Sequence, residues 1–268
     1  MKKIAVINDI SGFGKCSLSA ALPVISAHNI QCCPLPTGVF SNQTGYDSFE
    51  SADMTPYLKA FIGEWKKLNP VFDGILTGFI PNSEQGSIIL GFIRDFKSEN
   101  TVVAVDPIMG DDGEIYPCYD EKSIAAVKAL AKCADLITPN VTELALLCSM
   151  PLGKEYSVGE IEKMCRSLGN KLIAVTGITL NENEIANAVY DGESFNLVTS
   201  VKHGGHFSGT GDIFSAYVIS EYINSRDFYA SVKAAASFIE KAVAATEYDP
   251  SESYVAEGID FERFLKIV

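Results

Sequence analysis

Short apolar runs alternate along the chain with stretches whose apolar residues recur at helical spacing. Five runs are predicted to be strands, because each is short, continuous and rich in Val and Ile, as in strands buried on both faces. These runs cover residues 3–8, 73–78, 101–106, 135–138 and 171–176. The pattern predicts helices over residues 16–28, 53–67, 83–97, 120–133, 140–148, 157–168, 210–224 and 228–246.

Two further apolar runs, residues 184–191 and 194–203, flank Gly192 and predict a hairpin at one edge of a sheet. Strands that alternate with helices form a mostly parallel sheet with helices on both faces. The expected fold is therefore α/β, with three layers in which helices flank a mostly parallel central sheet. No repeat, low-complexity tract or linker interrupts the pattern, so we expect a single domain over residues 1–268.

The composition excludes several classes of function. Thirty-four acidic residues against 21 basic ones give a formal net charge of −13. We therefore expect no nucleic-acid or membrane partner, since either surface needs a basic face. No apolar stretch approaches the roughly 18 residues of a membrane span, and the seven cysteines show no CxxC pair or zinc spacing. These features indicate a cytoplasmic protein, in which an anionic substrate would need a divalent metal to supply positive charge.

Ligands bind sheets of this kind at the carboxyl ends of the strands, so the residues that follow each strand are the candidates for chemistry. The segment NDISGFGKCS (8–17) follows the first strand and fits neither common phosphate motif. A Walker A loop needs glycine at Asp9 and Ser or Thr at Cys16, and the dinucleotide fingerprint needs glycine at Ser17. The residues alone indicate a strand–helix turn eased by glycine.

Acidic residues gather after the strand at 101–106. The segment VDPIMGDDGEIY crowds Asp106, Asp111 and Asp112 into one proline–glycine turn. Like charges packed in this way repel one another unless solvent or a cation relieves them. The turn is either a solvated acidic loop or a magnesium site, since Mg²⁺ takes oxygen ligands and usually keeps several waters.

The segment TPNVTELALL (138–147) places Asn140 and Glu143 three residues apart where a helix begins. This spacing resembles a capping box, in which the two side chains satisfy backbone N–H groups and need no chemistry. The same spacing also puts both side chains on one face of the helix, where they can hold metal-bound water. Both interpretations stay open at this point.

The stretch GGHFSGTGDIFSAY (204–217) leads through glycines and hydroxyl residues to Asp212, where another helix begins. Free N–H groups at a helix start attract anions, and glycines let a phosphate approach closely. Alone, Asp212 is explained equally well as a partner of the helix dipole. Together with the acidic turn and the NxxE segment, the stretch indicates phosphoryl transfer, which needs a phosphate cradle, a metal-holding acidic set and a carboxylate.

Several segments resemble a known family. SGTGDIFSA (208–216) resembles the signature of the ribokinase-like superfamily, and VDPIMGDDG, ITPNVTEL and LTGFIPNSEQ are similar to segments of its vitamin kinase branch. PLPTGVFSNQTGY (34–46) is most similar to pyridoxal kinases, whose FSNxTGY segment lines the pyridine pocket. The similarity runs over residues 3–246, and the chain is identified as a member of the pyridoxal kinase family.

The resemblance implies a homodimeric kinase of vitamin B6 salvage that uses ATP and Mg²⁺. Such an enzyme phosphorylates the 5′-hydroxymethyl group of pyridoxal, pyridoxine or pyridoxamine. The implied site residues are Asp212 as general base; Gly209, Thr210 and Gly211 as anion hole; Asp106, Asp111 and Glu143 around water-bound Mg²⁺; Thr138, Asn140 and Thr176 at ATP; and Asp9, Thr44 and Phe79 in the vitamin pocket.

Two positions depart from the pyridoxal kinase pattern. Most pyridoxal kinases carry serine where Asp9 stands and tyrosine where Phe79 stands, whereas NDISGFG is similar to the TDPSGGAG start of hydroxymethylpyrimidine kinases. A hydroxymethylpyrimidine kinase of thiamine biosynthesis is therefore the alternative. A non-catalytic nucleotide-binding sensor is a third hypothesis; Asp212 and Glu143 argue against it, since a pure binder has no use for a base.

Overall fold

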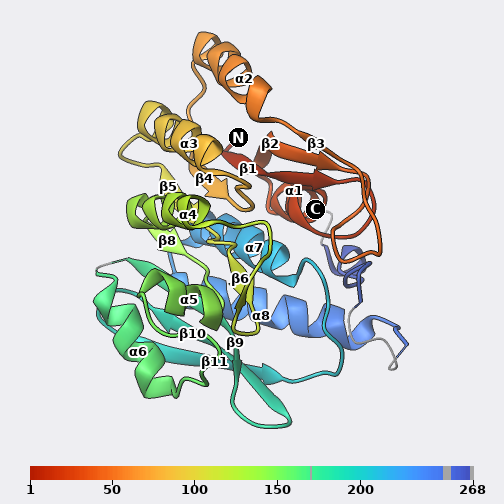
Figure 1. Ribbon diagram of the computed structural model, residues 1–268. Coiled ribbons are helices and arrows are strands. Elements are labelled where there is room, and N and C mark those ends of the chain that lie inside the picture. Colours follow the sequence, from red (N-terminus) through yellow and green to blue (C-terminus); the bar gives the residue numbers. More distant parts are fainter. Residues whose placement is uncertain (170, 250–254, 266–268) are drawn as a thin grey trace.

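The computed structural model describes residues 1–169, 171–249 and 255–265. Within them, a nine-stranded sheet has the order β11-β10-β9-β8-β5-β4-β1-β2-β3 (Figure 1). Its strands are β1 (Lys3–Ser11), β2 (Gln31–Phe40), β3 (Ser51–Asp53), β4 (Gly74–Thr77), β5 (Val102–Val105), β8 (Leu136–Ile137), β9 (Leu172–Thr179), β10 (Glu184–Tyr190) and β11 (Phe195–Val201). Neighbours from β9 to β2 pair in parallel, whereas β10 and β11 at one edge and β3 at the other pair antiparallel.

Helices cover both faces of the sheet, and a short antiparallel hairpin stands apart from it. The helices are α1 (Ser17–Ala27), α2 (Thr55–Leu68), α3 (Ser83–Phe96), α4 (Glu121–Cys133), α5 (Val141–Leu147), α6 (Val158–Ser167), α7 (Thr210–Ser225) and α8 (Phe228–Ala245), with a 3₁₀ turn at Glu262–Phe264. The hairpin consists of β6 (Gly110–Asp111) and β7 (Glu114–Ile115). None of the helices in the described ranges is both long and apolar enough to cross a membrane.

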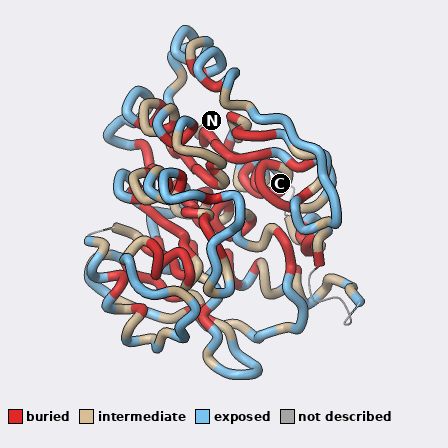
Figure 2. Tube along the Cα trace, in the orientation of Figure 1, coloured by how far each residue is buried: buried red, intermediate tan, exposed pale blue. Residues whose placement is uncertain are grey.

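The alternation of side chains along the strands divides the core into two layers. Ile4 and Val6 of β1 pack with apolar residues of α1, α7 and α8. Ala5 and Ile7 point to the opposite face and pack with residues of α2 to α6. Buried residues follow the strands and the inner sides of the helices (Figure 2). The expected three-layer α/β fold with a mostly parallel central sheet is therefore confirmed.

The largest departure from the predicted elements is β2, which the apolar pattern did not indicate. This strand contains Pro34 and Pro36, residues that lack the N–H needed for pairing on both sides. They are tolerated because β3 pairs with β2 only from Gly38 to Phe40, which leaves one edge of β2 unpaired at the prolines. The other predicted strands and helices are present, with their ends shifted by a few residues.

Candidate active site

The carboxyl ends of the parallel strands meet along one edge of the sheet. The Gly78 N–H donates to the carbonyl of Ile7 at 2.9 Å, and the Asp106 N–H donates to the carbonyl of Thr77 at 2.9 Å. In the same way, the Thr138 N–H donates to the carbonyl of Val105 at the end of β5. The segments that follow β1, β4, β5 and β8 therefore lie side by side, which is where ligands bind in open parallel sheets.

Asp212 lies in the first turn of α7, close to the end of β1. The Nδ2 of Asn8 donates a hydrogen bond to Asp212 Oδ1 at 2.9 Å. The first N–H groups of a helix have no acceptor within the helix, and no described residue accepts from the N–H groups of Thr210, Gly211 or Asp212. A carboxylate and free N–H donors therefore share one helix start, as the anion-hole hypothesis requires.

The surroundings of Asp212 favour its use as a base. Burial raises the pKa of Asp212 above its usual range, while hydrogen bonds from the Ser17 backbone and the Asn8 side chain oppose the rise. A general base works best when its pKa approaches the working pH. The arrangement can therefore accept a proton from a substrate hydroxyl, provided that the hydroxyl lies within hydrogen-bond reach.

Glycine stands at positions 209 and 211, before Asp212, for two different physical reasons. Gly209 has a φ of +75°, a region that favours glycine, and a Cβ there would strike the backbone carbonyl of Lys15. A Cβ at Gly211 would come no closer than 4.0 Å to its nearest neighbour, Asp106 Oδ2. Chain packing thus explains the glycine at 209 but not the one at 211, whereas a phosphate at the helix start would explain the second.

Asp9 is buried near the end of β1, with 6% of its surface exposed. Ser17 Oγ donates to Asp9 Oδ1 at 2.7 Å, and Ser11 Oγ donates to Oδ2 at 3.3 Å. Burial raises the pKa of Asp9 to about 6; the Asp212 charge adds to this rise, and the two serine hydroxyls oppose it. In its ionised form the side chain can accept hydrogen bonds from a ring substituent or a protonated ring nitrogen.

Phe79 follows β4 and lies next to Asp9, because the backbone N–H groups of both residues donate to Asn8 Oδ1, at 2.7 and 3.0 Å. Its half-buried ring contacts the rings of Phe40 and Tyr119 edge to face, with centroids 6.3 and 6.0 Å apart. The structure therefore brings the backbones of Asp9 and Phe79 together around the Asn8 side chain.

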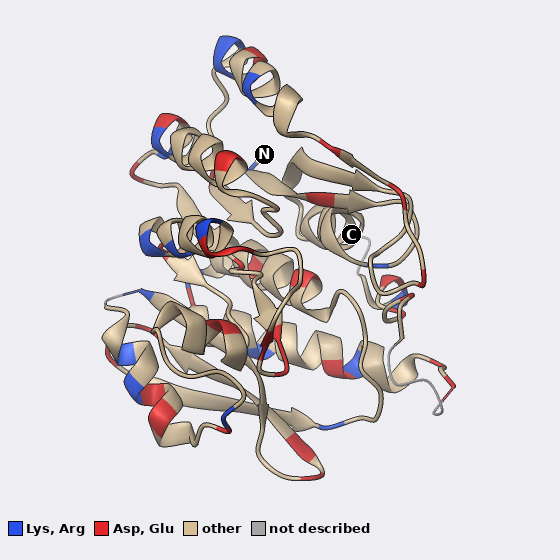
Figure 3. Cartoon of the chain, in the orientation of Figure 1, with Lys and Arg blue, Asp and Glu red and all other residues tan. Residues whose placement is uncertain are grey.

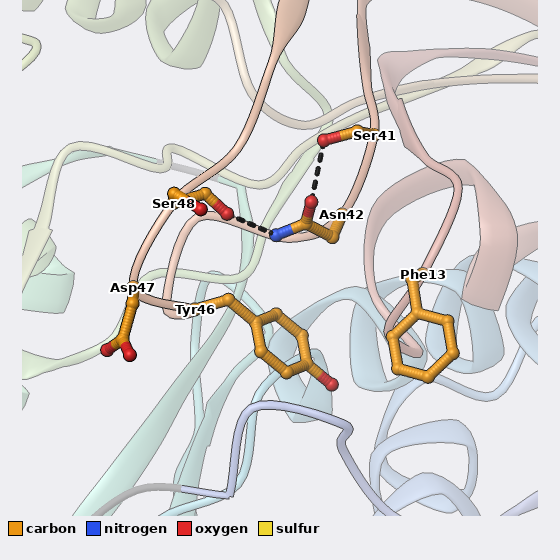
Figure 4. A pocket seen from close by; sticks show the side chains of 6 residues that line it. All are labelled: Phe13, Ser41, Asn42, Tyr46, Asp47 and Ser48. Atoms are coloured by element: carbon orange, nitrogen blue, oxygen red, sulfur yellow. Dashed lines mark hydrogen bonds between the residues drawn. The ribbon is translucent and has the colours of Figure 1, made fainter.

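Thr44, the third predicted pocket residue, lies exposed in the loop between β2 and β3. The described residues show no hydrogen bond between Thr44 and either Asp9 or Phe79. The same loop borders a hollow of about 410 Å³ against the turn after β1, where the rings of Phe13 and Tyr46 are 5.9 Å apart (Figure 4). Its lining residues are Phe13, Ser41, Asn42, Tyr46, Asp47 and Ser48. A role for Thr44 in substrate binding stays a prediction.

Asp106 and Glu143 are both buried, with 6% and 4% of their surface exposed. Asp106 accepts a hydrogen bond from Ser215 Oγ of α7 at 3.1 Å, and Glu143 Oε1 accepts one from the Met109 N–H at 3.1 Å. Burial raises the pKa of both carboxyls well above their usual range. The Asp212 charge adds to the rise at Asp106, and the Asp106 charge adds to the rise at Glu143.

The capping box at the start of α5 is confirmed. Asn140 Oδ1 accepts the Glu143 N–H at 2.8 Å, and Glu143 Oε2 accepts the Asn140 N–H at 2.9 Å. Asn140 Nδ2 also donates to the Gly110 carbonyl at 2.8 Å and to Asp111 Oδ1 at 3.2 Å. The Asn140 side chain therefore holds the β6–β7 hairpin against α5, and its contact with ATP stays a prediction.

The acidic set fits Mg²⁺ only through intervening water. Among the described residues, no group of three or more His, Cys, Asp or Glu side chains could hold a metal ion directly. Yet no Lys, Arg or His of the described residues forms an ion pair with Asp106 or Glu143. Lysines and arginines are seen instead on the outer helices α2, α3, α4 and α6 (Figure 3). Mg²⁺ commonly binds one or two carboxylates, several waters and the substrate phosphates, which suits these residues.

Of the two threonines predicted at ATP, Thr138 directly follows β8 and Thr176 lies within the neighbouring strand β9. Thr138 is buried and interacts with the Asp106 side chain. Its hydroxyl forms no hydrogen bond with acceptable distance and angles to any described residue. Thr176 is half-buried in β9, and its N–H donates to the Pro139 carbonyl at 2.9 Å. Both therefore stand at the ligand edge of the sheet, and their contact with ATP stays a prediction.

Two residues at this edge were not singled out from the sequence. His206 lies 3.7 Å from Asp111 Oδ2 and 3.7 Å from Asp112 Oδ2, and its pKa is raised, chiefly through its hydrogen bond to Asp111. The sequence feature that could have pointed to His206 is its place within the glycine-rich stretch 204–217. For Asn8, the sequence offered only a polar residue at the end of the predicted strand 3–8.

The fold and the site together define the class of protein. A parallel sheet that presents a carboxylate beside free N–H donors at a helix start, with two buried carboxylates nearby, is suited to transfer a phosphoryl group to an alcohol. Comparison with known sequences agrees with this class. The chain belongs to the phosphomethylpyrimidine kinase family, whose model matches residues 16–255.

Individual relatives come from both vitamin pathways. A putative pyridoxal kinase of Schizosaccharomyces pombe is 28% identical over 230 residues, which cover 78% of this chain and 64% of that protein. A hydroxymethylpyrimidine/phosphomethylpyrimidine kinase of Aquifex aeolicus is 27% identical over 172 residues, which cover 63% of this chain and 66% of that protein. Each match thus spans less than two thirds of the relative.

A solved structure matches nearly the whole chain. It is a putative phosphomethylpyrimidine kinase from Bacteroides thetaiotaomicron, crystallised in an orthorhombic form with pyridoxal. The two structures have a TM-score of 0.92 at 33% identity, covering 98% of this chain and 94% of the other. The expected relationship to the pyridoxal kinases of the ribokinase-like superfamily is confirmed. The chain is similar to pyridoxal kinases and to hydroxymethylpyrimidine kinases alike.

Proposed function

We propose that this chain uses ATP and Mg²⁺ to phosphorylate the 5′-hydroxymethyl group of pyridoxal, pyridoxine or pyridoxamine. The observation that carries the proposal is the position of Asp212 beside the free N–H groups that begin α7. A pyridine substrate is supported by the related Bacteroides protein, which was crystallised with pyridoxal. A role in vitamin B6 salvage, a cytoplasmic location and a homodimeric state belong to the same proposal and rest on the family resemblance.

In the proposed reaction, Asp212 accepts the proton of the substrate hydroxyl while the hydroxyl oxygen attacks the γ-phosphorus of ATP. The bond between that phosphorus and the β–γ bridging oxygen breaks, and ADP leaves. The N–H groups of Thr210 and Gly211, in the turn shaped by Gly209, donate to the oxygens of the transferring group. Bound Mg²⁺ supplies positive charge to the phosphates, and Asp106, Asp111 and Glu143 would hold it through water.

Hydroxymethylpyrimidine is the second candidate substrate, and Asp9 is the observation that favours it. The family model and the Aquifex relative name pyrimidine kinases, and Asp9 stands in a segment similar to theirs. A buried carboxylate can accept hydrogen bonds from an aminopyrimidine as well as from a pyridine, so its chemistry alone does not separate the two. The stacking surface of Phe79 suits either ring.

Turnover of a panel of alcohols separates the two substrates. We expect a higher kcat/KM for at least one of pyridoxal, pyridoxine and pyridoxamine than for hydroxymethylpyrimidine, measured as ADP release in a coupled assay. A higher kcat/KM for hydroxymethylpyrimidine than for every pyridine vitamer would assign the chain to the thiamine pathway. ATP binding without phosphorylation of any of these alcohols would favour the nucleotide-binding sensor.

Replacing Asp9 with Ala should weaken substrate binding by about 1–3 kcal/mol, the usual loss when a buried polar group loses its partner. The loss should appear mainly as a higher KM for the vitamin, with the KM for ATP unchanged. Asp9→Ser, which introduces the residue that most pyridoxal kinases carry there, serves as the companion variant and should retain more of the pyridine activity than Asp9→Ala. An unchanged KM in Asp9→Ala would remove Asp9 from the vitamin pocket.

A further inference from the structure

The Asn8 side chain contacts three residues of the candidate active site, although no sequence motif pointed to it. Its side chain is 4% exposed. Its Nδ2 donates to Asp212 Oδ1 at 2.9 Å, and its Oδ1 accepts the N–H groups of Asp9 at 3.0 Å and Phe79 at 2.7 Å. One amide group thus joins the start of α7 to the ends of β1 and β4, where the base and the predicted pocket residues lie.

The chain also fixes the orientation of this amide. Gly78 packs directly against the Asn8 side chain, and a Cβ at position 78 would overlap its Nδ2, Cγ and Oδ1 atoms. Because Oδ1 is occupied by two backbone donors, the opposite orientation of the amide would place its NH₂ group against the N–H groups of Asp9 and Phe79. Only the observed orientation satisfies all three partners, so the donor is held toward Asp212.

We infer that Asn8 is a positioning residue that holds the Asp212 carboxylate in the orientation needed to accept the substrate proton, and that it couples this carboxylate to the vitamin pocket. The inference rests on the proposed function. An ionised carboxylate has about four acceptor sites, so the bond from Asn8 leaves capacity for a substrate hydroxyl. Asn8 itself need not touch the substrate.

The donor from Asn8 matters because the other side chains facing Asp212 offer it no positive charge. Asp9 of β1 and Asp106 after β5 both interact unfavourably with it, and Cys16 at the start of α1 lies in its field. Without a neutral donor at a fixed place, repulsion from Asp9 and Asp106 would turn the carboxylate away from both. A displacement of about 1 Å at a reacting group can cost about 10²-fold in rate.

A double-mutant cycle tests the inference. Asn8→Ala should lower kcat by about 10- to 100-fold with the KM for ATP unchanged, and it should cause no further loss in an Asp212→Asn background. Asn8→Asp keeps an acceptor for Asp9 and Phe79 but removes the neutral donor, so it should lose kcat as Asn8→Ala does. Asn224→Asp, at the opposite end of α7, is the matched control, because its Nδ2 donates to the His28 carbonyl far from the reaction; its kcat should not change.

Thermal unfolding gives a second readout that does not depend on the reaction. It is measured for the wild-type chain, Asn8→Ala, Asp212→Asn and the double variant. Asn8→Ala should lower Tm more in the wild-type background than in the Asp212→Asn background, because a hydrogen bond to an ionised carboxylate is stronger than one to a neutral amide. Equal kcat losses in the two backgrounds would overturn the positioning role, as would a kcat that Asn8→Ala leaves unchanged. A wild-type chain inactive on every alcohol would overturn the proposed function alone, and the unfolding cycle would still decide whether Asn8 holds Asp212.

Discussion

Asp212→Asn is expected to lower kcat by about 10²–10⁴, the range typical for loss of a general base. The amide oxygen of Asn can still accept the hydrogen bond from Asn8, so the start of α7 keeps its geometry. It cannot accept the proton of the substrate hydroxyl. The loss should appear in single-turnover phosphorylation of the vitamin, while ATP binding, measured by calorimetry, should be nearly unchanged.

Stability should respond in the opposite sense to activity. Asp212 has a raised pKa because its ionised form is poorly solvated, and the neutral amide avoids that cost. We therefore expect Tm to stay the same or rise slightly, a pattern common where a site trades stability for activity. Asp227→Asn is the matched control, because Asp227 caps α8 by accepting the Ala230 N–H and Asn caps equally well. A loss of Tm with full turnover in Asp212→Asn would show that Asp212 only caps its helix.

The fold could be predicted wherever burial leaves an apolar signal in the sequence. The central strands are buried on both faces and read as continuous apolar runs, so β1, β4 and β5 were found from those runs alone. β2 was missed because its prolines suggest a turn, and a strand is possible there only because β3 does not pair with β2 at the prolines. The hairpin of β6 and β7 has two residues in each strand, too few to show any period.

The candidate site could be predicted as a set of segments but not as a set of contacts. The rule that ligands bind at the carboxyl ends of strands selected the segments 8–17, 105–116 and 138–147, and the structure places the starts of these segments along one edge. Which side chains meet there depends on packing across the sheet. Asn8 and Asp212 are 204 positions apart in the sequence, so their hydrogen bond exists only because α7 lies on the face toward which Asn8 points. No local pattern could indicate that pairing.

The metal requirement should depend on Glu143. Replacing it with Gln removes one of the carboxylates that would hold water-bound Mg²⁺, and loss of such indirect partners typically costs about 10- to 100-fold in metal affinity or activity. We therefore expect a higher Mg²⁺ concentration at half-maximal activity and a lower kcat. Initial rates measured across a Mg²⁺ series at saturating vitamin, and repeated with Mn²⁺, check both expectations.

The capping role of Glu143 must be separated from its metal role. Both of its carboxylate oxygens accept a backbone N–H, from Met109 and from Asn140. The NH₂ group of Gln must therefore face one of these donors, at a cost of about 1–3 kcal/mol, so Tm is expected to fall. Asp111→Asn, at a more exposed position, tests the same metal set with less disturbance to the fold.

A second capping box provides the control for the Glu143 experiment. Glu160 stands at the same position of α6 and accepts the Ser157 N–H at 2.9 Å, and it shares no hydrogen bond with Asp106, Asp111 or Glu143 among the described residues. Glu160→Gln should change Tm modestly and leave the Mg²⁺ requirement untouched, because it disturbs only a cap and the ion pair of Glu160 with Lys154. If Glu143→Gln and Asp111→Asn also leave the Mg²⁺ requirement untouched, the acidic turn is a structural and solvated feature. A shift in that requirement for both variants, absent in Glu160→Gln, would mean that the buried carboxylates organise the metal.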